Sequence, residues 1–207
     1  GLSKFNLNDQ KDETFKRLII EKPFGYDLKS SQELNKNLHA CFKEDQIFRI
    51  DHYLGKETVQ NLLVTRFSNS IFEPLWNRNY IHHIEITASE QVGVGNRGGY
   101  YESSGALRDM VQNHLFNLLA MVAMEPPVDL KANSIRNETI KVFQSIRRFS
   151  KKDISKNIIR GQYTSARIGK EKVNSYREEP GVDKNSQTET YVAMKAFIDN
   201  WRWSGIP

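Results

Sequence analysis

The 207-residue sequence has only one cysteine, Cys41, and no long apolar run. A single cysteine excludes a disulfide within the chain and offers no metal-ligand spacing, so we predict no metal site. No apolar segment approaches the roughly 20 residues that a membrane-spanning helix needs, and no charged-then-apolar leader opens the chain. We therefore expect a cytoplasmic protein that has no membrane partner.

The sequence also lacks a strong excess of one charge. Lys and Arg number 30 and Asp and Glu 25, which gives a net charge of +5. This balance suits an anionic partner such as a phosphate ester or a nucleic acid, and charge alone leaves both open. The basic residues are interleaved with acidic ones, and the densest basic cluster is short: Arg147, Arg148, Lys151 and Lys152, followed by Asp153. A solvated face is the better interpretation of this cluster, so we expect no nucleic-acid partner.

The first fifty residues have the pattern of an α/β layer. A polar helix end at residues 12–16 leads into a short apolar strand at 17–21. Ser30 and Ser31 suit the start of a helix that runs to residue 44, and residues 46–50 predict a second strand. The order strand, helix, strand implies a parallel pair.

A different pattern begins near Asp51, where we place a domain boundary. We expect a helix that ends at residue 67, a strand at 81–88 and a flexible glycine-rich loop at 93–105. The strongest helical pattern covers residues 106–124 and stops at Pro126 and Pro127. Two further strands, at 160–163 and 190–198, complete an α+β region.

Residues 93–98 match the G-x-G-x-x-G dinucleotide fingerprint, but their context argues against that function. The fingerprint requires its third glycine to open a helix within a strand–helix–strand unit. Here we expect residues 99–104 to separate Gly98 from any helix, with no second strand after it. We therefore interpret the segment as a loop.

Two clusters of polar residues could carry chemistry. His52 and Lys56 are four apart and would share a helix face beside Tyr53, which suits a phosphate monoester; an ordinary surface helix start is the competing interpretation. His114 lies on the polar margin of the 106–124 helix with Asp109, and it could be a general base or a structural histidine. Asp51, at a strand end, is the best candidate for a carboxylate that orients such a base.

Two single positions lie at the ends of predicted strands. Pro23 constrains the backbone of Lys22, and it could equally be an ordinary turn proline. Glu90 follows the 81–88 strand and could be a rim charge.

Taken together, these stretches resemble the glucose-6-phosphate dehydrogenase family. The most specific motif is Arg49-Ile50-Asp51-His52-Tyr53-Leu54-Gly55-Lys56-Glu57, and Glu21-Lys22-Pro23-Phe24-Gly25 precedes it. Further matching motifs follow in family order at residues 59–62, 76–78, 97–101, 108–115 and 202–203. The resemblance covers essentially the whole chain.

The resemblance implies a role for each candidate residue. His114 is similar to the family's general base, and Asp51 to the carboxylate that orients this base. His52, Tyr53 and Lys56 match the phosphate-binding positions, whereas Glu90 and Asp109 match residues that bind sugar hydroxyls. Lys22 resembles a lysine between cofactor and substrate, beside a proline that is often cis in this family.

The implied fold class combines α/β with α+β. Residues 1–50 would be the C-terminal part of a Rossmann-like parallel-sheet coenzyme domain. Residues 51–207 would be part of a large, mostly antiparallel-sheet catalytic domain with helices on one face. We expect the family's glycine-rich dinucleotide turn and a later substrate lysine to lie outside this chain, which suggests a truncated form.

The implied activity is oxidation of glucose 6-phosphate at C1 to the 6-phosphogluconolactone, with hydride transfer to NADP or, as the alternative, NAD. The partners would be the sugar phosphate, the cofactor and, in the full-length protein, a second copy or three further copies of the chain. A non-catalytic sugar-phosphate-binding fragment is the first alternative, because the cofactor turn is missing. Nucleic-acid binding is the second, and it would depend strongly on salt.

Overall fold

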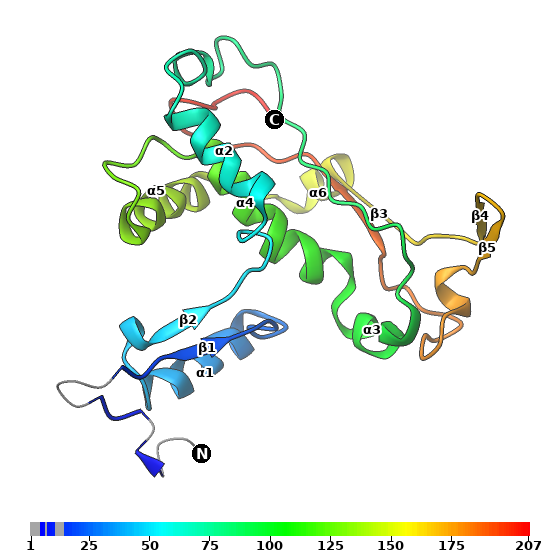
Figure 1. Ribbon diagram of the computed structural model, residues 1–207. Coiled ribbons are helices and arrows are strands. Elements are labelled where there is room, and N and C mark those ends of the chain that lie inside the picture. The colour runs from blue at the N-terminus through cyan, green and yellow to red at the C-terminus, as the bar shows by residue number, and fades with distance from the viewer. Residues whose placement is uncertain (1–4, 7, 11–14) are drawn as a thin grey trace. The chain divides into compact units, whose positions relative to one another are not determined.

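The computed structural model describes residues 5–6, 8–10 and 15–207, and the chain divides into two compact units, Gly1–His52 and Tyr53–Pro207. Figure 1 traces the helices and strands of both. The helix end predicted at 12–16 lies partly outside the described residues, and residues 15 and 16 are not helical.

The first unit is the predicted parallel strand pair with its connecting helix. Strand β1 (Leu18–Ile20) pairs with β2 (Ile47–Arg49), with Leu18 opposite Ile47 and Ile20 opposite Arg49. Helix α1 (Leu28–His39) connects them, and a short 3-10 turn (Glu44–Gln46) precedes β2. Ile47, Phe42 and the Gln46 side chain are buried. The predicted strand–helix–strand order is therefore confirmed.

The start and end of α1 differ from the prediction. Asp27 is the N-cap, and its carboxylate accepts a hydrogen bond of 2.8 Å from the backbone N–H of Ser30. In return, the Ser30 hydroxyl oxygen accepts a hydrogen bond of 3.1 Å from the Asp27 backbone N–H. Ser30 is therefore the third helical residue and not the cap. A carboxylate satisfies a free helical N–H as well as a hydroxyl does. The helix ends at His39, five residues earlier than expected.

The second unit begins with a turn rather than a helix. Helix α2 covers Glu57–Phe67, with Lys56 as its N-cap. Its end at residue 67 confirms the prediction, but residues 52–56 form turns. His52 and Lys56 therefore do not share a helix face, and the spacing argument for them was wrong.

The glycine-rich segment is more regular than a flexible loop. A 3-10 turn (Gly95–Arg97) leads into helix α3 (Gly98–Ala106), so the expected separation of Gly98 from a helix was wrong. A different observation argues against dinucleotide binding. A Cβ on Gly98 would lie 2.2 Å from the Pro180 carbonyl oxygen, so this helix start is covered by residues of the same unit.

The helix predicted at 106–124 has two parts. Residues Leu107–Leu115 form a π-helix, and α4 (Phe116–Ala123) continues it as an α-helix. The chain enters it through Gly105, whose φ of 64° breaks the run from α3. The helix ends one residue before the predicted position.

Antiparallel pairs supply the strands of this unit. Strand β3 (Ile158–Gly161) pairs with β6 (Tyr191–Met194), and β4 (Ala166–Ile168) forms a hairpin with β5 (Glu171–Val173). β3 and β6 confirm the two predicted strands within a few residues. Parallel and antiparallel pairs with helices give the predicted combination of α/β and α+β.

The strand predicted at 81–88 does not form a ladder among the described residues. The segment has no regular secondary structure, but Ile84, Ile86 and Ala88 are less exposed than their neighbours, as the alternation predicted. One backbone bond joins it to another segment, from the Ile84 N–H to the Pro207 carbonyl at 3.1 Å. The burial pattern was therefore predictable, whereas the pairing was not.

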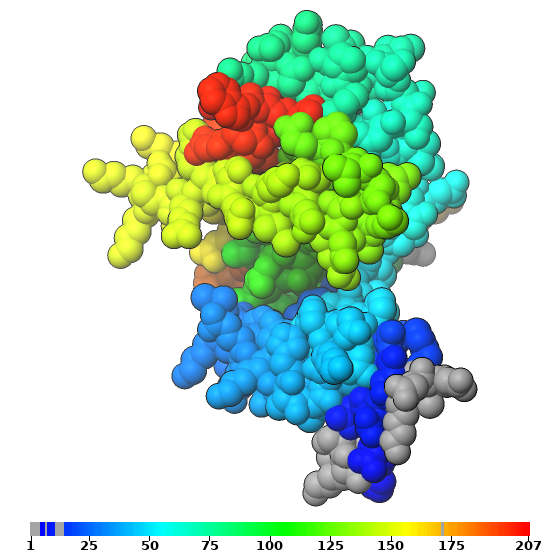
Figure 2. Space-filling view, turned by 90° about the vertical axis from the view of Figure 1, so that its left-hand side faces the viewer, coloured from blue at the N-terminus to red at the C-terminus, as the bar shows by residue number. Residues whose placement is uncertain are grey.

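The core of the second unit is built around the end of α4. Helix α5 (Ala132–Ser145) and the C-terminal segment pack against it. Figure 2 shows the C-terminal residues, in red, beside the yellow-green surface of α5. The buried cluster contains Ala120, Ala123, Met124, Val142, Ile198 and Trp203.

The basic cluster at 147–152 lies on the surface, as expected. Arg147 pairs with Asp199 at 2.6 Å, and α6 (Lys151–Asn157) begins at Ser150 with Asp153 in its capping box. Among the described residues, no helix combines the length and the hydropathy of a membrane span.

Candidate functional site

The predicted base lies against one of the predicted phosphate-binding residues, Tyr53, which in turn contacts a second, Lys56. His114 is only 1% exposed, and its ring stacks on Tyr53 with the centroids 4.2 Å apart and the planes at 16°. The Lys56 ammonium lies 3.5 Å from the centroid of the same tyrosine ring. The imidazole and the ammonium therefore both contact the ring of Tyr53.

The π-helix affects the directions in which Asp109 and His114 point relative to each other. They are five positions apart, which on an α-helix would separate their directions by about 140°. In a π-helix, hydrogen bonds join residues i and i+5, so five positions make about one turn. Both residues lie within Leu107–Leu115 and both are buried. The wider turn therefore brings the acid and the histidine towards the same side.

Asp109 has a tyrosine partner that the sequence did not single out. The Tyr100 hydroxyl donates a hydrogen bond of 3.2 Å to Asp109 Oδ1. Burial raises the pKa of Tyr100, and the neighbouring Asp109 charge raises it further. Tyr100 is therefore a neutral donor that fixes the carboxylate. It belongs to the motif at 97–101, which was the only signal for it.

Glu90, which follows the segment at residues 81–88, also contacts Tyr53. The Tyr53 hydroxyl donates a long hydrogen bond of 3.4 Å to Glu90 Oε1, and Glu90 itself is exposed. The second unit thus brings together four of the predicted residues, Tyr53, Lys56, Glu90 and His114, and Asp109 lies on the same π-helix as His114.

The remaining predicted residues belong to the first unit and follow its two strands. Ile20 and Arg49 are opposite each other at the ends of β1 and β2, so Lys22 and Asp51 both leave the carboxyl edge of the parallel pair. The Lys22–Pro23 peptide bond is cis. His52 is exposed, with Nδ1 4.0 Å from Glu21 Oε1. The carboxyl edge is where α/β sheets bind ligands.

Side chains distant in sequence hold the C-terminal end of the helix that carries His114. Arg66 donates hydrogen bonds of 2.9 Å to the carbonyls of Met121, Val122 and Met124. The Trp203 indole donates to the Ala123 carbonyl at 2.8 Å. A helix end leaves four carbonyls without partners inside the helix, and these bonds satisfy them. The sequence did not predict this arrangement.

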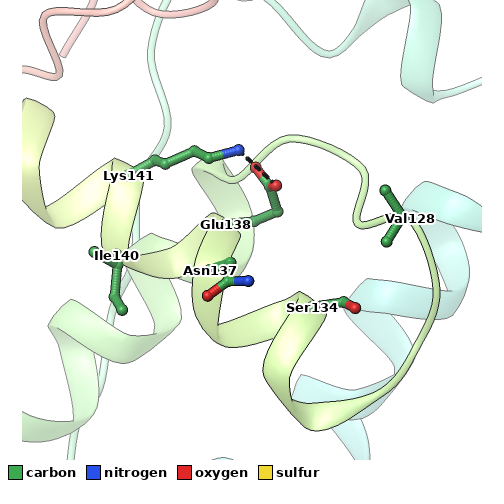
Figure 3. A pocket seen from close by; sticks show the side chains of 6 residues that line it. All are labelled: Val128, Ser134, Asn137, Glu138, Ile140 and Lys141. Atoms are coloured by element: carbon green, nitrogen blue, oxygen red, sulfur yellow. Dashed lines mark hydrogen bonds and ion pairs between the residues drawn. The ribbon is translucent and has the colours of Figure 1, made fainter.

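A pocket in the second unit lies away from these residues. It has a volume of about 400 Å³ and is formed by α5 and the preceding loop, as Figure 3 shows. Its Lys141 and Glu138 form an ion pair of 2.7 Å across the helix surface. None of the predicted site residues lines this pocket.

Fold and site together define a two-part α/β and α+β protein, with polar residues at a strand edge in one part and a buried histidine beside a lysine and a tyrosine in the other. Two family models match it: "Glucose-6-phosphate dehydrogenase, NAD binding domain" over residues 1–61 and "Glucose-6-phosphate dehydrogenase, C-terminal domain" over residues 63–207. The chain belongs to the glucose-6-phosphate dehydrogenase family.

Individual relatives agree with this assignment. The chain is 56% identical over 206 residues to glucose-6-phosphate 1-dehydrogenase of Aggregatibacter actinomycetemcomitans, and 53% identical over 206 residues to that of Treponema pallidum. All of this chain is covered in both alignments, against 42% and 40% of the two relatives. The chain therefore spans about two fifths of the length of these curated relatives.

Solved structures show the same fold. The crystal structure of glucose-6-phosphate 1-dehydrogenase from Mycobacterium avium matches with a TM-score of 0.84 and 44% identity, over 100% of this chain and 42% of that one. A glucose-6-phosphate dehydrogenase in complex with its substrate glucose-6-phosphate matches with a TM-score of 0.88 and 40% identity, over 99% of this chain and 41% of that one.

Proposed function

We propose that the protein to which this chain belongs oxidises glucose 6-phosphate at C1 to the 6-phosphogluconolactone, with NADP as the hydride acceptor and NAD as the alternative. The observation that carries the proposal is the arrangement of Lys56, Tyr53 and His114. A cation for the phosphate and a base for the sugar hydroxyl both lie against the ring of one buried tyrosine. Family membership and the substrate named for a solved relative support the choice of sugar phosphate.

His114 is the proposed general base. It accepts the proton of the C1 hydroxyl as the hydrogen on C1 leaves with its electron pair, so that C1 and its oxygen form the carbonyl of the lactone. Asp51 is predicted to be the carboxylate that orients the base and stabilises its charged form. Asp51 belongs to the first unit, so its partnership with His114 stays a prediction.

Phosphate recognition is assigned to Lys56 and Tyr53, with His52 as the third predicted contributor. The Lys56 side chain is exposed and has the compact charge that suits a phosphate monoester. Binding the phosphate far from C1 supplies energy that can be used to position C1 against the base.

Sugar recognition is assigned to Glu90 and Asp109. Carboxylates accept hydrogen bonds from sugar hydroxyls. Asp109 lies on the same π-helix as the proposed base, and Tyr100 already fixes one of its oxygens. This supports Asp109 as an acceptor held in a constant position relative to His114.

The nicotinamide cofactor, when bound, accepts the hydride from C1. Among the described residues, the part of the chain suited to binding the cofactor is the carboxyl edge of the β1–β2 pair, where Lys22 follows β1. No glycine-rich strand–turn–helix of a parallel sheet occurs in the described part of the chain. We therefore propose that Lys22 lies between cofactor and substrate, and assign no other cofactor contact to this chain.

The proposal extends to domains, assembly and compartment. Residues 1–50 would be part of the coenzyme domain and 51–207 part of the catalytic domain. The intact protein would be a homodimer or a homotetramer in the cytoplasm, without nucleic-acid or membrane partners. Size-exclusion chromatography with light scattering tests the assembly, and a salt titration with duplex DNA tests the nucleic-acid alternative.

Replacing the base tests the proposed reaction. In the intact protein that carries this chain, His114→Asn should lower kcat by at least about 100-fold, because general base catalysis contributes about 10²–10⁴-fold. Binding of glucose 6-phosphate, measured by calorimetry, should persist. Asp51→Asn should also lower kcat, since the imidazolium loses its proposed partner.

Two outcomes would contradict the proposal. Full turnover by His114→Asn would rule out His114 as the base. Binding of glucose 6-phosphate by the unsubstituted intact protein without reduction of NADP or NAD would favour the non-catalytic sugar-phosphate-binding alternative. His83→Asn, at an exposed histidine outside the site, is the matched control and should leave turnover unchanged.

A further inference from the structure

Glu189 holds the N-terminal end of the helix that carries Asp109 and His114. Its Oε1 accepts a hydrogen bond of 3.1 Å from the Leu107 N–H, and its carbonyl accepts one of 2.9 Å from the Ala106 N–H. Leu107 is the first residue of the π-helix, so its N–H is one of the donors that the helix cannot satisfy internally. Glu189 is only 9% exposed. It follows the loop after Asp183 and immediately precedes Thr190 and β6, so it connects the strand to the helix.

Gly105 makes this approach feasible. Its φ is +64°, and a Cβ at this position would lie 2.7 Å from Glu189 Oε1. A side chain here would both strain the backbone and push the carboxylate away from Leu107. The glycine and the glutamate therefore act as one structural feature, and together they determine where the π-helix starts.

The charges at the two helix ends have the signs that the helix dipole favours. The Glu189 carboxylate is at the N-terminal end, and the Arg66 guanidinium is at the C-terminal end. Both ends are thus attached to residues outside the helix. With the start and the end fixed, the helix cannot rotate or shift without breaking these bonds, so the directions of Asp109 and His114 are fixed as well.

The cation near Glu189 does not compete with the hydrogen bond between its carboxylate and the helix. Arg160 on β3 is the nearest cation, at 3.8 Å from Glu189 Oε2, and its side chain is 61% exposed. This distance is longer than a hydrogen bond, and the pair uses the oxygen that does not bind Leu107. The stronger interaction of the carboxylate is therefore with the helix.

We infer that Glu189 is a positioning residue, which acts through the Leu107 amide and the glycine at 105 to hold His114 and Asp109 in reactive geometry. The catalytic consequence rests on the proposed function; the structural one does not. None of the sequence motifs that identify the family includes Glu189.

Kinetics of the intact protein test the inference. Glu189→Ala should lower kcat by about 10- to 100-fold, because a displacement of about 1 Å in a catalytic group has effects of this order. The affinity for glucose 6-phosphate should fall less than kcat, since the phosphate contacts at Lys56 do not involve this helix start. Glu189→Gln should recover most of the loss, because its amide oxygen can still accept from Leu107.

Gly105→Ala provides an independent variant. It leaves the glutamate in the chain but displaces its carboxylate, so it should reproduce the loss of kcat seen with Glu189→Ala. If Glu189→Ala does not fold, Glu189→Gln and Gly105→Ala still test the inference, because only Gly105→Ala should lose turnover. Unimpaired turnover in both variants would overturn the inference.

Glu102→Gln is the control for loss of a half-buried, hydrogen-bonded acid. Glu102 Oε1 accepts from the Tyr176 and Ser186 hydroxyls at 2.6 Å each, and has no bond to the helix start. This variant should lower the thermal midpoint without a matching loss of kcat. A kcat loss in Glu189→Ala no greater than in equally destabilised Glu102→Gln would show a merely structural role and overturn the inference.

Two spectroscopic measurements keep this test separate from that of the proposed reaction. Glu189→Ala should speed hydrogen exchange at the Leu107 amide and shift the imidazole proton resonances of His114, with or without substrate. If the unsubstituted protein shows no dehydrogenase activity, the proposed function fails while these measurements still decide the inference. An unchanged Leu107 exchange rate and unchanged His114 resonances would overturn it.

Discussion

At the scale of single residues, Tyr53 links the two proposed chemical roles of the site. Its ring contacts both the Lys56 ammonium and the His114 imidazole, and its hydroxyl donates to Glu90. The face of an aromatic ring carries partial negative charge, so it favours a cation on either side. The ring thereby holds Lys56 in place, and in the proposed reaction it would also stabilise the protonated form of His114.

Replacing Lys56, the proposed phosphate-binding lysine, should separate binding from chemistry. In the intact protein, Lys56→Met should raise the KM for glucose 6-phosphate by about 30- to 100-fold, the size of a lost charge-assisted hydrogen bond. kcat should change much less, because the base and C1 are not altered. Steady-state kinetics measure both quantities.

Lys131→Met is the control, since Lys131 is an exposed lysine paired with Asp129 outside the site. It should leave KM unchanged. A loss in kcat for Lys56→Met as large as the rise in KM would argue that Lys56 acts at the reaction centre instead of at the phosphate.

At the scale of elements, the helix from Leu107 to Ala123 owes its exact placement to groups outside it. Arg66 is fully buried, and burial lowers the pKa of its guanidinium although Glu73, 3.1 Å away, opposes this. Glu73 also pairs with Arg202 at 2.8 Å, which makes a partly buried network under the helix end. Such a network constrains geometry because removing one member leaves the others unpaired.

Removing the guanidinium should destabilise the protein strongly. Arg66→Met leaves the carbonyls of Met121, Val122 and Met124 without this donor and leaves Glu73 with one cation fewer. We expect the free energy of unfolding to fall by about 3–5 kcal/mol. Urea denaturation of the intact protein, followed by circular dichroism, measures this change.

Arg147→Met is the matched comparison, because Arg147 forms an exposed pair with Asp199. Exposed pairs contribute about 0–1 kcal/mol. Equal effects of the two substitutions would contradict the importance of burial at Arg66.

At the scale of the whole molecule, a group of tyrosines in the second unit makes stability depend on alkaline pH. Burial raises the pKa of Tyr101 to about 12, with a further contribution from the Asp109 charge. Burial and the bond to Glu102 also raise the pKa of Tyr176, and the pKa of Tyr163 is raised by burial. The rings of Tyr101 and Tyr163 each pack edge to face against the ring of Tyr176.

Stability should therefore fall as the pH rises from about 10 to about 12. Unfolded tyrosine loses its proton near pH 10, whereas folded Tyr101 keeps it until about pH 12, so the unfolded state gains stability across this window. Below pH 10 the two states bind the same proton, and this contribution is constant. Tyr101→Phe should show a shallower fall in thermal midpoint between pH 10 and 12.

Tyr80→Phe, at a tyrosine that is 68% exposed, is the control for removal of a surface hydroxyl. A Tyr101→Phe profile that falls as steeply as the unsubstituted one would contradict a role of this tyrosine in alkaline unfolding.

The sequence by itself determined the order of elements and the main candidates for the site. The parallel β1–β2 pair, the end of α2 at Phe67 and the strands β3 and β6 follow from apolar periodicity and turn residues, which are local properties. The shared helix of Asp109 and His114 was predictable for the same reason.

Only the tertiary structure decided how these residues meet. The turn at residues 52–56 replaced the predicted helix face and locally places Lys56 against Tyr53, whereas tertiary folding stacks the Tyr53 ring on the distant His114. The π-helix and its fixation by Glu189 and Arg66 had no local signal, because Glu189 is 82 positions from Leu107, and Arg66 56 positions from Val122. Hydrogen bonds between groups so distant in sequence form only when the chain is packed. They fix the helix, and with it the position of His114.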